Sequence, residues 1–190
     1  MNSGQVKLIR VTPIIKRPTH ALLCKEGFTF YPFPNQLREV HIIFMNRYTI
    51  GIGMRNCRNG IEFYCPSIDR PITLNTSGRT IVTGRNNKST TCCIFATFLD
   101  YLACLTYNFT HNNNSNNHDY IIINNPSNFS QVVLDAETYI DIKCFLPNND
   151  VGKTMTLTLQ DRLRDRVSDM SYLYSDKFSN FHELIKNSYI

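Results

Sequence analysis

The sequence predicts an α+β fold in which helices cover one side of an antiparallel sheet. Apolar and polar residues alternate with strand periodicity over residues 39–83, and a second series of such segments begins at residue 120. Between them, residues 90–105 carry apolar side chains at the spacing of an amphipathic helix. A chain of 190 residues with 42% hydrophobic and 18% charged residues can bury a core of ordinary globular composition.

Residues 1–33 are expected to form an extended N-terminal arm. A short strand is predicted over 5–11, where apolar and basic residues alternate. Proline lacks a backbone N–H and fixes φ, so a long helix is not expected where prolines recur at positions 13, 18, 32 and 34.

Residues 34–107 are predicted to form the first folded unit. Two short strands are expected on either side of Ser77 and Gly78, a pair that predicts a hairpin because glycine tolerates the positive φ of a tight turn. A helix is expected over 90–105, with Ser89 as its N-cap. The other strands predicted in this unit are 39–45, 47–54 and 62–65.

Residues 108–118 are rich in asparagine and low in complexity, and they are expected to link the first unit to a second one at 119–190. In the second unit a turn or short exposed helix is expected over 161–170, and a final helix over 179–187. The strands predicted there are 120–123, 130–137, 138–146 and 154–160.

The two parts of the chain differ in charge. Residues 1–100 contain 13 lysine and arginine residues against 5 acidic ones, whereas residues 101–190 contain 7 against 10. An excess of cations in only one half indicates that this half faces a polyanion, although an unevenly charged solvated surface would give the same count.

The cysteines and the apolar segments indicate in which cellular compartment the protein is expected. Seven cysteines without a signal-peptide pattern favour reduced thiols in the cytosol or nucleus over a disulfide scaffold, and the chain is not expected to be secreted. No apolar run approaches the ~20 residues that a membrane-spanning helix needs. Because no Cys-x2-Cys spacing occurs, the sequence predicts neither a metal site nor a cofactor.

Two segments resemble one repeat of the TATA-box-binding protein family. The run Ile72–Arg85 contains a Ser-Gly-basic turn between two short strands and ends in Thr-Gly before polar residues, and Tyr48–Asn56 resembles the strand that ends in Ala-Arg-Asn in that family. The resemblance implies a curved, saddle-like antiparallel sheet with helices on its convex side. It would comprise one clear repeat at 34–107 and one degenerate repeat at 119–190.

The resemblance also implies a non-catalytic, transcription-associated factor that binds AT-rich duplex DNA and proteins of the transcription machinery, in the nucleus or at a viral transcription site. Asn75 stands where the family has a wedge phenylalanine, and Glu39 stands near its base-reading asparagine, so the implied contacts are mainly to phosphates. The residues implied to contact DNA are Arg55, Asn56, Arg79, Val82, Thr83, Arg85 and Lys88.

Two other interpretations remain open. Residues 147–154 imitate a phosphate-binding loop, but Pro147 stands at its first glycine position and the following residues alternate like a strand, which argues against nucleotide hydrolysis. The chain is therefore not expected to be an enzyme. The main alternative to DNA binding is a viral accessory or structural protein that binds other proteins on an α+β scaffold. A heterodimer is a further expectation for the assembly of the chain.

Overall fold

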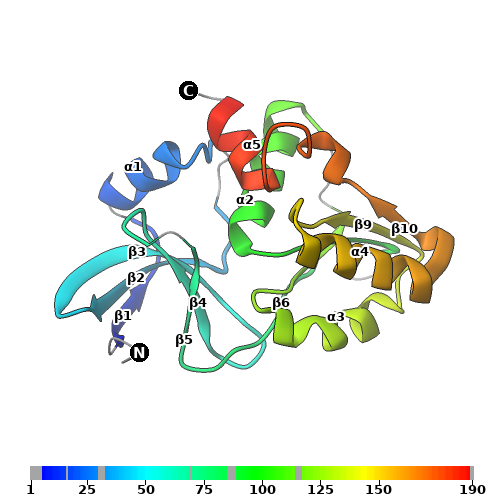
Figure 1. The fold of residues 1–190 in the computed structure, drawn as a ribbon. Helices are drawn as coiled ribbons and strands as arrows, with labels where there is room; N and C mark the ends of the chain where they lie inside the picture. The colour runs from blue at the N-terminus through cyan, green and yellow to red at the C-terminus, as the bar shows by residue number, and fades with distance from the viewer. Residues whose placement is uncertain are drawn as a thin grey trace.

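The computed structural model describes residues 6–15, 17–29, 33–68, 70–84, 89–113 and 117–188. The fold is α+β: a curled antiparallel sheet lies beside a mixed sheet that has helices on both faces (Figure 1).

The first sheet is an antiparallel meander in which each strand pairs with the next along the chain. Its strands are β1 (Lys7–Thr12), β2 (Leu37–Phe44), β3 (Arg47–Arg55), β4 (Ile61–Tyr64) and β5 (Ile72–Leu74). A Cβ at Gly51 would lie 2.2 Å from the carbonyl oxygen of Tyr64, and one at Gly53 would lie 2.8 Å from Ile61. These glycines let the sheet curl around an apolar interior that includes Val40, Ile42 and Phe63.

The segment expected to be an extended arm contains a helix. The predicted strand is confirmed as β1, but α1 (Arg17–Lys25) follows it and buries Leu23 in the main core. Pro18 lies in the first turn of α1, where its missing N–H costs no helical hydrogen bond. The prolines therefore do not prevent the helix, which ends before Gly27, a glycine with a φ of 81°.

The second sheet has the strand order β10-β9-β7-β8-β6. Strands β7 to β10 are parallel, and β6 pairs antiparallel with β8 at one edge. The strands are β6 (Thr80–Val82), β7 (Thr91–Phe95), β8 (Asp119–Ile122), β9 (Asp141–Phe145) and β10 (Val167–Asp169).

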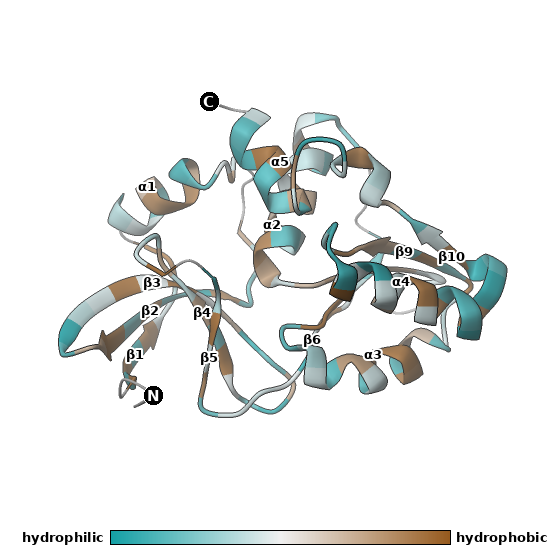
Figure 2. Ribbon diagram, in the orientation of Figure 1, coloured by the Kyte–Doolittle hydropathy of each residue, from teal (hydrophilic) through white to brown (hydrophobic). Residues whose placement is uncertain are grey.

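Helices connect the parallel strands and cover both faces of this sheet. The α-helices are α2 (Phe98–Thr110), α3 (Phe129–Ala136), α4 (Asp150–Leu163) and α5 (Phe181–Ser188), and the 3-10 turns are η1 (Pro126–Asn128), η2 (Arg164–Arg166) and η3 (Ser171–Leu173). Helices α2 and α5 pack with α1 and the first sheet on one face, whereas α3 and α4 pack on the other. Hydrophobic and hydrophilic positions alternate along α4, as expected for a helix with one buried side (Figure 2).

The hairpin predicted at Ser77 and Gly78 is wrong, although both of its strands exist. Strand β5 pairs with β4 in the first sheet, and β6 pairs with β8 in the second. The intervening segment is thus the connection between the two sheets. Gly27 is the only glycine with positive φ in the described part of the chain, so Gly78 does not adopt the turn conformation that the prediction required.

The helix predicted over 90–105 is two elements. Residues Cys92 to Phe95 lie in β7, the central strand of the parallel sheet, and α2 begins three residues later. Thr97 is its N-cap, with a reciprocal capping box to Asp100, so Ser89 does not cap a helix. A strand buried on both faces is continuously apolar, which sequence periodicity alone does not distinguish from a helix.

Two strands predicted in the second unit are helices. Residues predicted as strands over 130–137 and 154–160 lie in α3 and α4. The strand predictions at 120–123 and 138–146 are confirmed in outline by β8 and β9, and the final helix is α5. The described part of 119–190 therefore consists of strand–helix–strand units and not of a second antiparallel meander. No helix in the described ranges is long and apolar enough to cross a bilayer.

Candidate nucleic-acid interface

The described acidic residues of the first hundred positions are buried inside the protein. The four that the structure describes are each no more than 2% exposed: Glu26, Glu39, Glu62 and Asp100. Burial of a carboxylate is costly unless it receives hydrogen bonds or ion pairs, and each of the four receives them.

Glu26 follows α1 and pairs with α5. Its Oε2 lies 2.9 Å from Nζ of Lys186 and 3.2 Å from Nε2 of His182. Burial would raise the pKa of Glu26, but the hydrogen bonds and charges of these two residues prevail and lower it to about 2. The negative charge of Glu26 is therefore neutralised internally.

The other three carboxylates also have internal partners. Glu62 accepts hydrogen bonds from Asn56 and Thr73, and Asp100 caps α2 and accepts one from the backbone N–H of His182. Burial raises the pKa of both groups despite these hydrogen bonds. Glu39 accepts hydrogen bonds from two buried side chains on α1 and β2.

Most of the described cations of the same segment point outward. Eight of them are exposed: Lys7, Arg10, Arg17, Lys25, Arg47, Arg55, Arg58 and Arg70. They lie on β1, α1, both ends of β3 and the two loops that flank β4. In the described part of residues 1–100, every exposed charged side chain is thus positive. We call the outer surface of β1–β5 and α1 the basic surface.

The second half of the chain has a mixed surface. Asp150, Asp161, Asp165, Asp169 and Asp176 are exposed among its cations. Arg162 pairs with Glu137, with Nη2 2.6 Å from Oε1. A polyanion would therefore be attracted to the first sheet and would meet repulsion over α4 and β10.

The structure separates the seven residues predicted to contact DNA. Arg55 is exposed at the end of β3, and Thr83 is exposed just after β6. Arg79 is committed to an ion pair with Asp135 of α3. Arg85 and Lys88 lie outside the described residues.

The two remaining predicted residues, Asn56 and Val82, are buried. The Asn56 carboxamide accepts hydrogen bonds from the backbone N–H groups of Arg58 and Gly60 and donates to Glu62 and to the carbonyl of Thr76. Asn56 thus stabilises the turn between β3 and β4. Val82 packs in the main core.

A crevice lies at the carboxyl ends of the parallel strands. The chain order of these strands reverses between β7 and β9, and doubly wound sheets bind ligands at such a point. The N-cap residues of α2 and α4, Thr97 and Asn149, line a 360 Å³ cavity there together with Arg70. Arg70 and Thr97 also line a neighbouring 270 Å³ cavity. Arg70 therefore places a cation of the first sheet at the crevice.

Residues 147–154, which imitate a phosphate-binding motif, border this crevice on the α4 side. The expectation that a strand follows Thr154 is wrong, because α4 begins at Asp150. The other argument stands: Pro147 provides no N–H, and Asn149 caps the helix by accepting from the N–H of Gly152. A Cβ at Gly152 would lie 2.0 Å from the Pro147 carbonyl oxygen, so the backbone of Pro147 packs directly against Gly152.

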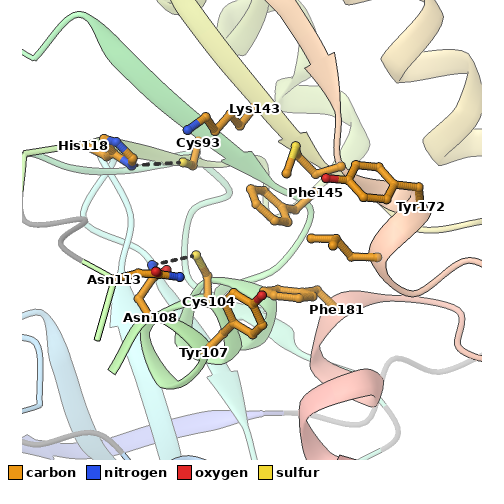
Figure 3. Close-up of a pocket in the computed structure, with 12 residues that line it drawn as sticks. Cys93, Cys104, Tyr107, Asn108, Asn113, His118, Lys143, Phe145, Tyr172 and Phe181 are labelled. Atoms are coloured by element: carbon orange, nitrogen blue, oxygen red, sulfur yellow. Dashed lines mark hydrogen bonds between the residues drawn. The ribbon is translucent and has the colours of Figure 1, made fainter. Parts of the chain in front are cut away.

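A separate 400 Å³ pocket lies between α2, β9 and η3 (Figure 3). The thiols of Cys93 and Cys104 face it, with Cys93 Sγ 3.9 Å from Nδ1 of His118. Burial raises the pKa of Cys93 to about 12 and raises that of Cys104 as well. Both thiols are therefore protonated at neutral pH.

Comparison of the chain with protein-family models, curated proteins and solved structures finds no match.

Sequence reasoning missed most of the exposed cations. Arg10, Arg17, Arg47, Arg58 and Arg70 lie outside the motif that resembles a TATA-binding repeat. The net charge of the first half was the available signal. It did not reveal that the acidic residues of that half are buried while the basic ones are exposed.

Proposed function

We propose that the chain is a nucleic-acid-binding protein that binds backbone phosphates through its basic surface. The observation that carries this proposal is the sorting of charge in residues 1–100, where the described carboxylates are buried and eight described cations are exposed. A surface with cations alone attracts a phosphate backbone and releases its condensed counterions on contact.

The more specific form of this proposal is a transcription-associated factor bound to AT-rich duplex DNA. The inner side of the curled first sheet is filled by its own apolar residues, Val40, Ile42 and Phe63 among them. We therefore assign DNA contact to the outer side and the strand ends. The mixed charges of the second half suit contacts to proteins of a promoter complex better than contacts to a second phosphate backbone.

The test is fluorescence anisotropy with a labelled AT-rich duplex and a labelled single strand over a salt series. The Arg17→Gln/Arg47→Gln/Arg55→Gln variant removes three exposed cations of the basic surface. The matched control, Lys153→Gln/Arg164→Gln/Lys177→Gln, removes three exposed cations of the second half.

For the basic-surface variant, the slope of log K against log salt should fall by about 0.9 per lost phosphate contact with duplex DNA. The control should bind like the unchanged protein. Equal losses in both variants would indicate nonspecific attraction, and absence of binding at ~50 mM salt would refute the proposal.

A second candidate function, protein docking, is favoured by an exposed apolar groove between η1, α3 and α4. Pro126, Phe129, Val151 and Met155 line a 450 Å³ depression there, and Val151 is exposed. An apolar groove on an otherwise polar surface is typical of a protein interface. A Val151→Asp change that leaves DNA binding intact but abolishes association with a partner protein would assign the two functions to different faces.

A further inference from the structure

A chain of hydrogen bonds connects the exposed ring of Tyr48 to a buried carboxylate. The Tyr48 hydroxyl contacts Nδ1 of His41, and Nε2 of His41 lies 2.7 Å from Oε1 of Glu39. Tyr48 is 61% exposed, whereas His41 and Glu39 are each 1% exposed. Strand pairing explains the arrangement, since Glu39 and His41, two residues apart, lie on the same face of β2 and Tyr48 lies on the neighbouring strand β3.

The hydrogen bonds depend on the tautomer of His41. Thr19 Oγ1 donates to Oε2 of Glu39. In the tautomer with the proton on Nε2, His41 donates to Oε1 of Glu39, and the lone pair of Nδ1 accepts from the Tyr48 hydroxyl.

This order of groups is that of an activated nucleophile: a hydroxyl, a base within hydrogen-bond reach and a carboxylate that orients the base. The network ends at a phenol on the surface.

We propose that Tyr48 is a nucleophile for phosphate esters, activated by His41, with Glu39 and Thr19 as positioning residues. The substrate class, a nucleic-acid phosphodiester, rests on the proposed function. It is supported locally by two exposed cations, Arg10 on the strand that pairs with β2 and Arg47, which directly precedes Tyr48.

The reaction is a transesterification that needs no further reactant. Tyr48 Oη attacks phosphorus and transfers its proton to Nδ1 of His41, which becomes an imidazolium stabilised by the Glu39 carboxylate. The bond from phosphorus to the leaving sugar oxygen breaks, that oxygen takes a proton from solvent water, and the His41 imidazolium returns its proton to solvent. The products are a tyrosyl phosphodiester and a strand with a free hydroxyl end.

The first arm of the test measures Tyr48 without nucleic acid. The whole chain is treated with diisopropyl fluorophosphate, and the labelled tyrosines are mapped by mass spectrometry. Tyr172 is the internal control, because it is 66% exposed and no hydrogen bond to a histidine occurs at its hydroxyl in the described structure. General-base assistance predicts that Tyr48 reacts about 100-fold faster than Tyr172.

Variants of Tyr48, His41 and Glu39 distinguish the nucleophile from the residues that activate it. Tyr48→Phe should abolish labelling at position 48 only. His41→Gln and Glu39→Gln should lower the ratio of Tyr48 to Tyr172 labelling within the same molecule, a readout that does not depend on overall stability. Equal rates for Tyr48 and Tyr172 in the unchanged protein would overturn the proposal.

The second arm tests the substrate. Labelled oligonucleotides with a bridging phosphorothiolate, whose thiolate leaves irreversibly, are incubated with the chain and analysed on denaturing gels. A covalent adduct that is lost in Tyr48→Phe supports phosphodiester attack. Labelling by the fluorophosphate without an adduct, in a protein that binds DNA, overturns the assignment of a phosphodiester. If DNA does not bind, the proposed function fails and the fluorophosphate arm alone decides whether Tyr48 is activated.

Discussion

Arg79 and Asp135 join the segment that enters the second sheet to α3 through a two-pronged ion pair. Arg79 Nε contacts Oδ2 of Asp135, and its Nη2 lies 3.0 Å from Oδ1. Arg79 lies in the connection between the two sheets, directly before β6, and Asp135 lies on α3. Arg79 was predicted from sequence to contact phosphate, but its fork of donors is already occupied.

Replacing Arg79 by methionine should lower the free energy of unfolding by about 1–3 kcal/mol, because Asp135 loses its charged partner in a half-buried site. Urea denaturation measures this change. The Asp135→Asn variant and the double variant complete a mutant cycle. Additive losses would show that the two residues are not coupled.

The Glu26 cluster predicts a specific loss of stability in acid. The pKa of Glu26 falls from its usual 4.5 to about 2 on folding, so its contribution is complete above pH 4.5 and is lost as the pH falls towards 2. The shift corresponds to about 3 kcal/mol. The difference in unfolding free energy between the unchanged protein and Glu26→Gln should therefore shrink from pH 5 to pH 3. A difference that stays constant over this range would contradict the assignment.

Asn56 should behave as a structural residue and not as a DNA contact. The Asn56→Ala change removes four hydrogen bonds at a buried turn and leaves Glu62 short of a donor, so it should cost about 2–4 kcal/mol of stability. At a temperature where the variant is folded, its anisotropy titration should keep the salt slope of the unchanged protein. A lower salt slope for the variant would indicate that Asn56 contacts DNA.

The seven thiols should react with DTNB in two groups. Cys24 and Cys57 are exposed and should react rapidly, whereas the other five are buried and should react only when the protein opens. The slow group is Cys65, Cys92, Cys93, Cys104 and Cys144. The Cys24→Ser/Cys57→Ser variant should lack the fast phase entirely, and more than two fast thiols in the unchanged protein would contradict the buried positions.

Sequence patterns predicted the meander better than the second half for a physical reason. Strands β2 and β3 are bounded by the tight turn at Met45 and Asn46, and their ends agree with the predicted ranges to within a few residues. The predictions for the second half were wrong where the apolar residues fit strand and helix periodicity equally well. Met155, Leu157 and Leu159 alternate like a strand, yet Leu157 is exposed and Leu159 is buried on α4.

The candidate interface was predictable only as a total charge. The excess of cations in the first half could be counted, but the burial of Glu26 depends on α5, some 160 residues further along the chain. Likewise, the contact of Tyr48 with His41 depends on how β2 and β3 are paired. Long-range partners decide which charges remain at the surface, and a single sequence does not specify them.

The pairing of α1 with α5 has a consequence for synthesis on the ribosome. Leu23 and Phe28 share a core with Phe181 and Ile185, so the earliest helix cannot complete its packing until the last one has emerged from the exit tunnel. Until then, the apolar side chains of α1 lack the part of this core that α5 supplies.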